Sequence, residues 1–174
     1  MKIAFLGGGN MAGALIGGML ARGFAARDIS VIEVSPAARE RLASQHGVRA
    51  SSAPDAATFE AHVLVLAVKP QDMKAALAAI GGTVRGKLVV SIAAGLRIGT
   101  LGRWLGGHGK IVRCMPNTPA LVGAGITALF AAPEVSPAER GSAESILQAV
   151  GEVVWVDEER LLDPVTAVSG SGPA

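Results

Sequence analysis

The sequence predicts an α/β domain built on a doubly wound, mostly parallel sheet with helices on both faces. Short, continuous apolar runs alternate along the chain with segments of helical periodicity, the pattern of strands joined by crossover helices. The first apolar run leads directly into three glycines, which favour a tight strand-to-helix turn. Aromatic residues make up only 3% of the chain and tyrosine is absent, so small aliphatic residues must form a closely packed helix-on-sheet interior.

The apolar runs and the turn residues between them define the expected elements. The strands are expected at Lys2–Leu6, Ile29–Val34, Val48–Ala50, Val63–Val68, Lys87–Ile92, Lys110–Cys114, Gly125–Phe130 and Glu152–Val156. The helices are expected at Met11–Gly23, Pro36–Ser44, Asp72–Ile80, Ile98–Leu105, Ser136–Val150 and Glu159–Val168. Asn10 is expected to cap the first helix, and Ser136 with Glu139 matches a capping box. Because strands and helices alternate, the strands should run parallel.

Charge and composition exclude several classes of function. The net charge is only +2 and the Lys and Arg residues are scattered, so no nucleic-acid surface is expected. No stretch of about 18 apolar residues lacks breakers, so no transmembrane helix is expected. The three histidines share no metal-ligand spacing, which predicts no metal site. The single cysteine, Cys114, is expected in the core, and its isolation favours a cytoplasmic protein without disulfides.

The glycine run predicts a dinucleotide site of the Rossmann type. Residues 7–12, Gly-Gly-Gly-Asn-Met-Ala, match the pattern G-x-G-x-x-G/A between a strand and a helix. Gly7 permits the tight turn, Gly9 lets the backbone approach a pyrophosphate, and Ala12 lets the helix pack on the strand. The amides of Asn10 and Met11 lie at the helix start, where an anion binds. The alternative is a structural turn that holds no ligand.

The end of the second strand gives conflicting indications about the cofactor. Glu33 follows Ala12 by 21 residues, the spacing of an acid that binds the ribose 2′-hydroxyl of NAD. Ser35 and Arg39 follow closely and suit the 2′-phosphate of NADP, which a carboxylate would repel. Glu33 and Arg39 are also explained as solvated surface charges. NAD(H) and NADP(H) therefore both stay open.

Further cofactor contacts are expected where other strands end, because ligands of open α/β sheets bind at the carboxyl edge. The expected cofactor-binding residues there are Val68, Lys69, Pro70, Ala93, Gly95, Met115, Pro116 and Asn117. Asn117 and Thr118 offer polar groups in a loop that two prolines stiffen, which suits the placing of a nicotinamide ring. Each of these segments is also explained as an ordinary turn.

Four segments taken together resemble pyrroline-5-carboxylate reductase. They are Phe5–Ala12, Ala67–Gln71, Arg113–Ala120 and Val168–Ala174, in this order along the chain. The resemblance implies reduction of 1-pyrroline-5-carboxylate to L-proline, the last step of proline biosynthesis, by hydride transfer from NADPH or NADH. It also implies a homodimer or a higher homo-oligomer when the protein is full length.

The resemblance also implies a division of the chain and a substrate site. Residues 1–157 would form the dinucleotide-binding domain, and residues 158–174 would begin a C-terminal helical domain for dimerisation and substrate binding. The implied substrate-binding residues are Asn117, Thr118, Ser169, Gly170, Ser171, Gly172 and Pro173. The loop over residues 169–174 would start a helix whose amides bind the substrate carboxylate. Since the 174 residues end there, we expect them to bind cofactor and to turn over poorly.

Hydride transfer to an imine requires no side-chain nucleophile, and no catalytic residue is nominated from the sequence. Two alternatives remain beside the reductase. One is a related β-hydroxyacid or imine dehydrogenase on the same sheet, and the other is a stand-alone nucleotide-binding module.

Overall fold

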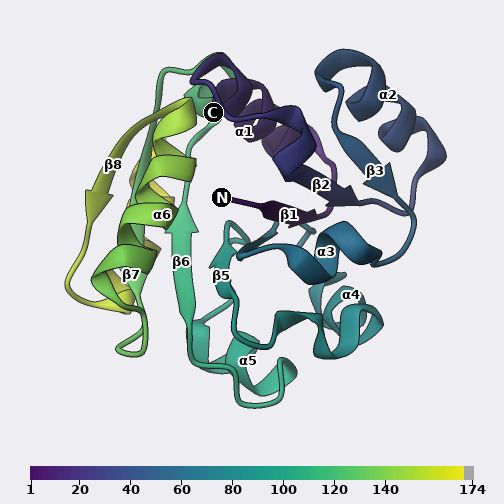
Figure 1. Ribbon diagram of the computed structural model, residues 1–174. Helices are drawn as coiled ribbons and strands as arrows, with labels where there is room; N and C mark the ends of the chain where they lie inside the picture. The colour runs from purple at the N-terminus through teal and green to yellow at the C-terminus, as the bar shows by residue number, and fades with distance from the viewer. Residues whose placement is uncertain (171–174) are drawn as a thin grey trace.

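The computed structural model describes residues 1–170, and these residues contain one eight-stranded sheet (Figure 1). The strand order is β3-β2-β1-β4-β5-β6-β7-β8. The strands are β1 (Ile3–Leu6), β2 (Ile29–Ile32), β3 (Arg49–Ser51), β4 (Val63–Leu66), β5 (Leu88–Ser91), β6 (Ile111–Met115), β7 (Gly125–Ala131) and β8 (Gly151–Trp155). The predicted fold class, a doubly wound and mostly parallel sheet, is confirmed.

Every neighbouring pair of strands from β3 to β6 is parallel, and the next pair is not. β7 runs antiparallel to β6, and β8 is parallel to β7. The sheet is thus mostly parallel, as predicted, and the inference from alternation that neighbouring strands run parallel fails for the pair β6–β7. The physical reason is the connection: only the short 3₁₀ turn η3 (Thr118–Val122) joins β6 to β7, whereas a parallel neighbour needs a long crossover.

Helices cover both faces of the sheet. They are α1 (Asn10–Ala21), α2 (Pro36–His46), α3 (Ala56–Glu60), α4 (Met73–Ile80), α5 (Ile98–Trp104), α6 (Pro137–Leu147) and α7 (Leu162–Val165). Within β1, Ile3 and Phe5 point into a core shared with α1, α2 and α6, while Ala4 and Leu6 point into a core shared with α4 and α5. Figure 1 shows α1 with α2 on one side of the sheet and α4 with α5 on the other.

Three details of the predicted helices were wrong. The five-residue helix α3 was not expected, although Asp55 and Thr58 form a capping box at its start. The N-cap of α1 is Gly9, which forms no side-chain cap, and Asn10 is already helical. The helix expected at 159–168 is a 3₁₀ turn, the short α7 and a π-helical segment at Thr166–Gly170. Pro164 lies inside α7 and lacks the amide hydrogen that a regular helix requires.

No helix among residues 1–170 has the length and hydropathy required to cross a membrane.

Cys114 is buried as expected, and burial raises the pKa of its thiol, so the side chain is an inert core residue.

Helix α1 approaches the far part of the chain at a glycine. A Cβ atom on Gly18 would overlap the carbonyl oxygen of Ala149, which lies in the 3₁₀ turn η4 (Gln148–Val150) after α6. A Cβ on Gly13, in the same helix, would lie 3.9 Å from His46 Nε2 and meet no closer atom. The two helical glycines therefore differ in what they permit: Gly18 allows close backbone packing, and Gly13 does not need to be glycine.

This difference predicts opposite signs for one substitution. Gly13→Ala should raise the free energy of unfolding by roughly 0.5–1 kcal/mol, because alanine is the better helix former. Gly18→Ala should lower it by about 1–3 kcal/mol, because the added methyl group forces α1 away from η4. Denaturant unfolding of both variants checks this, and equal stabilisation by the two would contradict the packing at Gly18.

A second prediction concerns acid. Lys110 in the loop before β6 lies 2.8 Å from the carboxylate of Glu139 in α6, which also accepts the amide and hydroxyl hydrogens of Ser136. These partners, Lys110 first, lower the pKa of Glu139 from 4.5 to about 2. Since the native pKa is the lower one, the stabilisation is complete above pH 4.5 and is lost as the pH falls toward 2.

Glu139→Gln should therefore cost about 1 kcal/mol of unfolding free energy at neutral pH, and the difference from the wild type should vanish toward pH 2. Glu40→Gln, which alters an exposed carboxylate on α2, serves as the control. Chemical unfolding at several pH values measures the unfolding free energy of both variants. If the difference between Glu139→Gln and the wild type stayed constant from neutral pH toward pH 2, the role assigned to the Glu139 carboxylate would be contradicted.

Candidate dinucleotide-binding site

The turn after β1 lies between its two neighbouring strands at the carboxyl edge of the sheet. The amide of Gly7 donates to the carbonyl of Ile32 at the end of β2, and the amide of Ala67 after β4 donates to the carbonyl of Leu6. Gly7 has φ +97°, and a Cβ there would lie 2.7 Å from the carbonyl oxygen of Ala67. Only glycine fits this position, so β1 can lead into α1 without displacing β4.

The start of α1 is an open seat for an anion. Gly9 occupies the N-cap position without a side-chain hydrogen bond, and a Cβ there would find no atom within 4 Å. The amides of the first helical turn, at Asn10 and Met11, have no carbonyl partner inside the helix by geometry. Ala12 is buried against the sheet, so the helix start is held close to β1. This arrangement fits a dinucleotide pyrophosphate without any side chain.

A cleft of about 630 Å³ opens beside this turn. Of the predicted cofactor-binding residues, Gly7, Gly9, Glu33, Val68 and Lys69 line it. The lining residues that were not predicted are Leu6, Gly8, Ile32, Val34, Ser52, Ala53, Pro54, Ala67, Asp72, Ala75, Ala76, Ala79 and Ile80. The three residues after β3 follow the same carboxyl-edge rule and could have been found from it, whereas no sequence pattern marks the face of α4.

Both carboxylate oxygens of Glu33 are held by main-chain amides at this cleft. One oxygen accepts the amide hydrogen of Gly8 at 2.7 Å, and the other accepts that of Ser35 at 2.8 Å. The guanidinium of Arg39 donates to the carbonyls of Glu33 and Val34, at 2.7 and 2.8 Å. The Ser35 hydroxyl accepts from Ala38 as the cap of α2. Glu33, Ser35 and Arg39 thus lie together as predicted, but only Glu33 lines the cleft.

The other predicted cofactor residues lie along the same sheet edge, outside the cleft. Register pairs Leu66 with Ser91 and Ser91 with Arg113, so the chain leaves β4, β5 and β6 at adjacent points. Pro70, Ala93, Gly95, Met115, Pro116, Asn117 and Thr118 follow these three strands. The helix expected at Asp72–Ile80 begins at Met73.

Asn117 has a structural contact that was not predicted. Its side-chain oxygen accepts the amide hydrogen of Ile126 at 2.9 Å, which ties the loop after β6 to β7. Thr118 is exposed. Of the predicted substrate-binding residues near the C-terminus, the structure places Ser169 and Gly170 in the π-helical segment. Ser171, Gly172 and Pro173 lie outside the described residues.

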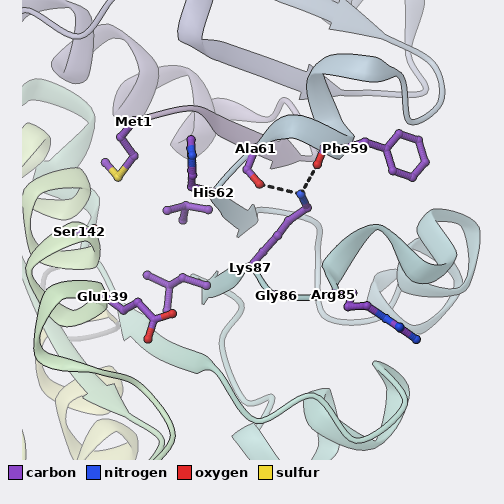
Figure 2. A pocket seen from close by; sticks show the side chains of 11 residues that line it. Met1, Phe59, Ala61, His62, Arg85, Gly86, Lys87, Glu139 and Ser142 are labelled. Carbon is purple, nitrogen blue, oxygen red and sulfur yellow. Dashed lines mark hydrogen bonds between the residues drawn. The ribbon is translucent and has the colours of Figure 1, made fainter.

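A second pocket, of about 710 Å³, lies at the opposite edge of the sheet (Figure 2). Its lining includes Val63 and Leu88, the first residues of β4 and β5. Buried Lys87 donates to the carbonyl oxygens of Phe59 and Ala61, both at 2.6 Å, and burial lowers the pKa of its ammonium group. These carbonyls lie at the end of α3, so Lys87 stabilises a helix terminus, and the pocket is at the wrong edge for a dinucleotide.

No group of residues suited to hold a metal ion occurs in residues 1–170. The candidate site consists of the glycine turn, the Glu33 carboxylate and the ends of β4, β5 and β6.

Comparison with known proteins agrees with this site. The chain is 44% identical over 174 residues to pyrroline-5-carboxylate reductase of Pseudomonas aeruginosa. This alignment covers 99% of this chain and 64% of that protein. A solved pyrroline-5-carboxylate reductase from Coxiella burnetii superimposes with a TM-score of 0.94 at 38% identity, covering 99% of this chain and 64% of that one. The pyrroline carboxylate reductase of Plasmodium falciparum, solved with NADP bound, gives 0.86 at 29% identity, over 99% and 63%.

The chain thus spans slightly less than two thirds of the length of these relatives. These relatives confirm the resemblance to pyrroline-5-carboxylate reductase that the four segments indicated. The family model described as NADP oxidoreductase, coenzyme F420-dependent, matches residues 2–95, which is more than half of the chain. The chain belongs to that family of oxidoreductases.

Proposed function

We propose that this chain is the dinucleotide-binding part of a pyrroline-5-carboxylate reductase, which reduces 1-pyrroline-5-carboxylate to L-proline with NADPH or NADH. The observation that carries the proposal is the uncapped start of α1 at Gly9, an open seat for a pyrophosphate, in a chain that is 44% identical to such a reductase. The proposed setting is the last step of proline biosynthesis in the cytoplasm, in a homo-oligomer of the full-length protein.

Different residues are proposed to bind different parts of the cofactor. The amides at Gly9, Asn10 and Met11 would hold the pyrophosphate, and Glu33 would lie beside the adenosine ribose. Lys69 and the residues from Met115 to Asn117 would border the nicotinamide, at the carboxyl ends of β4 and β6, which flank β5. The nicotinamide supplies the hydride, and the protein's contribution is to align the ring and the imine carbon.

The substrate side is proposed to involve the end of the chain. The main-chain amides of Ser169, Gly170, Ser171 and Gly172 would bind the substrate carboxylate, with Asn117 and Thr118 as further contacts. Residues 158–174 would be the start of a second, helical domain, which follows the dinucleotide-binding residues 1–157 and begins against the sheet. The direct test is loss of nicotinamide absorbance and formation of proline when the natural full-length protein is given 1-pyrroline-5-carboxylate. If no proline forms with NADPH and none forms with NADH, the proposed function is refuted.

NADP(H) is the proposed cofactor, supported by the family's description and by the NADP bound to the P. falciparum relative. Glu33 opposes this choice, because its carboxylate would repel a 2′-phosphate beside the ribose. We therefore propose that NADH is also used.

Gly9→Val should weaken binding of both NADPH and NADH by at least about a hundredfold, since the branched side chain would occupy the approach of the pyrophosphate. The fold should be unaffected, because a Cβ on Gly9 meets nothing within 4 Å. Gly141→Val is the matched control, as Gly141 is an exposed glycine of α6 whose Cβ would also meet nothing. Calorimetric titration measures the affinities, and an unchanged value for Gly9→Val would disprove the proposed seat.

Glu33→Gln should raise the affinity for NADPH relative to NADH by about tenfold, because a repulsion on the order of 1 kcal/mol or more is removed. NADH should bind no better, since the acceptor of the ribose hydroxyl is weakened. Titrating both cofactors into the wild type, Glu33→Gln and the control Glu40→Gln gives the ratio. A ratio that stays at the wild-type value would place Glu33 away from the 2′-position.

A further inference from the structure

Arg113 is a charged residue in the middle of a central strand. It heads the segment Arg113–Ala120 that the sequence singled out, yet the proposed binding scheme gives it no task. Its side chain is only 2% exposed, and it is among the largest fully buried side chains of the described residues. A buried guanidinium must be paired with carboxylates, or the strand would not tolerate it.

Two carboxylates from the end of the chain pair with it. Arg113 Nη1 lies 3.3 Å from Glu159 Oε1, and Arg113 Nη2 lies 3.0 Å from Asp163 Oδ1. The same Glu159 oxygen accepts the amide hydrogen of Ile98 at 2.7 Å. The second oxygen of Asp163 lies 3.5 Å from Nη2 of Arg97. We call these four side chains, Arg97, Arg113, Glu159 and Asp163, the arginine cluster.

The arginine cluster joins three segments that are far apart in sequence. Arg113 is in β6, Arg97 precedes α5, and Glu159 with Asp163 belongs to the turn η5 (Glu159–Leu161) and to α7. Each segment leads within a few residues to a part of the proposed site. Met115 follows Arg113 by two residues, Gly95 precedes Arg97 by two, and Ser169 follows Asp163 by six. The cluster is therefore the point at which the nicotinamide side and the substrate side are connected.

Stability alone does not explain such a cluster. Replacing a buried ion pair by well-packed apolar residues is often neutral or stabilising, whereas the planar guanidinium fixes the direction of two partners at once. Hydride transfer requires the ring and the acceptor carbon to be aligned, and a misplacement of about 1 Å can cost a hundredfold in rate. The reaction therefore requires these three segments to keep fixed orientations relative to one another.

We propose that the arginine cluster sets the relative positions of the loops after β5 and β6 and of the segment Thr166–Gly170 after α7, and that Arg113 is a positioning residue for hydride transfer. The inference rests on the proposed reductase function. It assigns no contact between Arg113 and the cofactor or substrate: the residue acts through Met115, Gly95 and the segment Thr166–Gly170.

The test uses the natural full-length protein and Glu159→Gln, which removes one partner of Arg113 on a side chain that is 23% exposed and so need not unfold the protein. The matched control is Glu158→Gln, because Glu158 is the preceding residue and pairs with Arg160 at the surface. Arg113→Lys is the second variant, since it keeps the charge but loses the two-pronged geometry. Two ligands are titrated, NADPH and 2′-phospho-ADP-ribose, which lacks the nicotinamide.

In Glu159→Gln and Arg113→Lys, kcat for proline formation should fall at least about tenfold and the affinity for NADPH should fall. The affinity for 2′-phospho-ADP-ribose should stay within about twofold, because the seat at Gly9 is distant in the fold. Glu158→Gln should leave all three values unchanged. An unchanged kcat, or an equal loss of affinity for both ligands, would overturn the positioning role. A wild type that binds neither ligand would instead overturn the proposed function itself.

Discussion

The close passage of the chain from β1 to α1 is the constraint on which the rest of the structure depends. Gly7 must be glycine, because φ is +97° and the carbonyl oxygen of Ala67 lies where a side chain would begin. This turn brings the amides at the start of α1 to the carboxyl edge of the sheet. Gly18, one and a half turns beyond Gly13 on the same helix, packs against η4 and holds the helix in that direction. Binding capacity therefore follows from backbone geometry, with little contribution from side-chain chemistry.

Most of the sheet could be predicted from the sequence because its strands are buried on both faces. An apolar run such as Val63–Leu66 has one physical explanation in this context, a strand covered by helices above and below. The direction of β7 could not be predicted, since its own residues fit either direction and the connection decides. The segment at Thr118–Val122 contains the turn residues of a loop, and only the folded chain shows that it forms η3 and reverses there.

The site was predictable where the main chain forms it and obscure where packing forms it. The glycines and Glu33 follow the spacing that is typical of dinucleotide-binding turns, so the sequence alone predicts that they lie together at this edge of the sheet. The wall formed by Ala75, Ala76 and Ala79 depends on how α4 lies against the sheet, and alanines in a helix carry no indication of what they face. The pairing of Glu33 with the Gly8 amide was also hidden, because it joins residues 25 positions apart.

The two halves of the proposed site are stabilised in different ways, and this difference bears on how such an enzyme works. The pyrophosphate half consists of main chain that hydrogen bonds to β2 and β4 and the packing of α1 on η4 hold in place. The proposed nicotinamide half lies at the loops after β5 and β6, close to the ion pairs that join Arg113 to Glu159 and Asp163, which are remote from it in sequence. Affinity for the cofactor can therefore be secured by one part of the chain, while alignment for hydride transfer requires the end of the chain to be in place. Under the proposed function, the main chain at the start of α1 would supply affinity for the coenzyme, and the ion pairs of Arg113 would be needed for alignment of the nicotinamide with the imine.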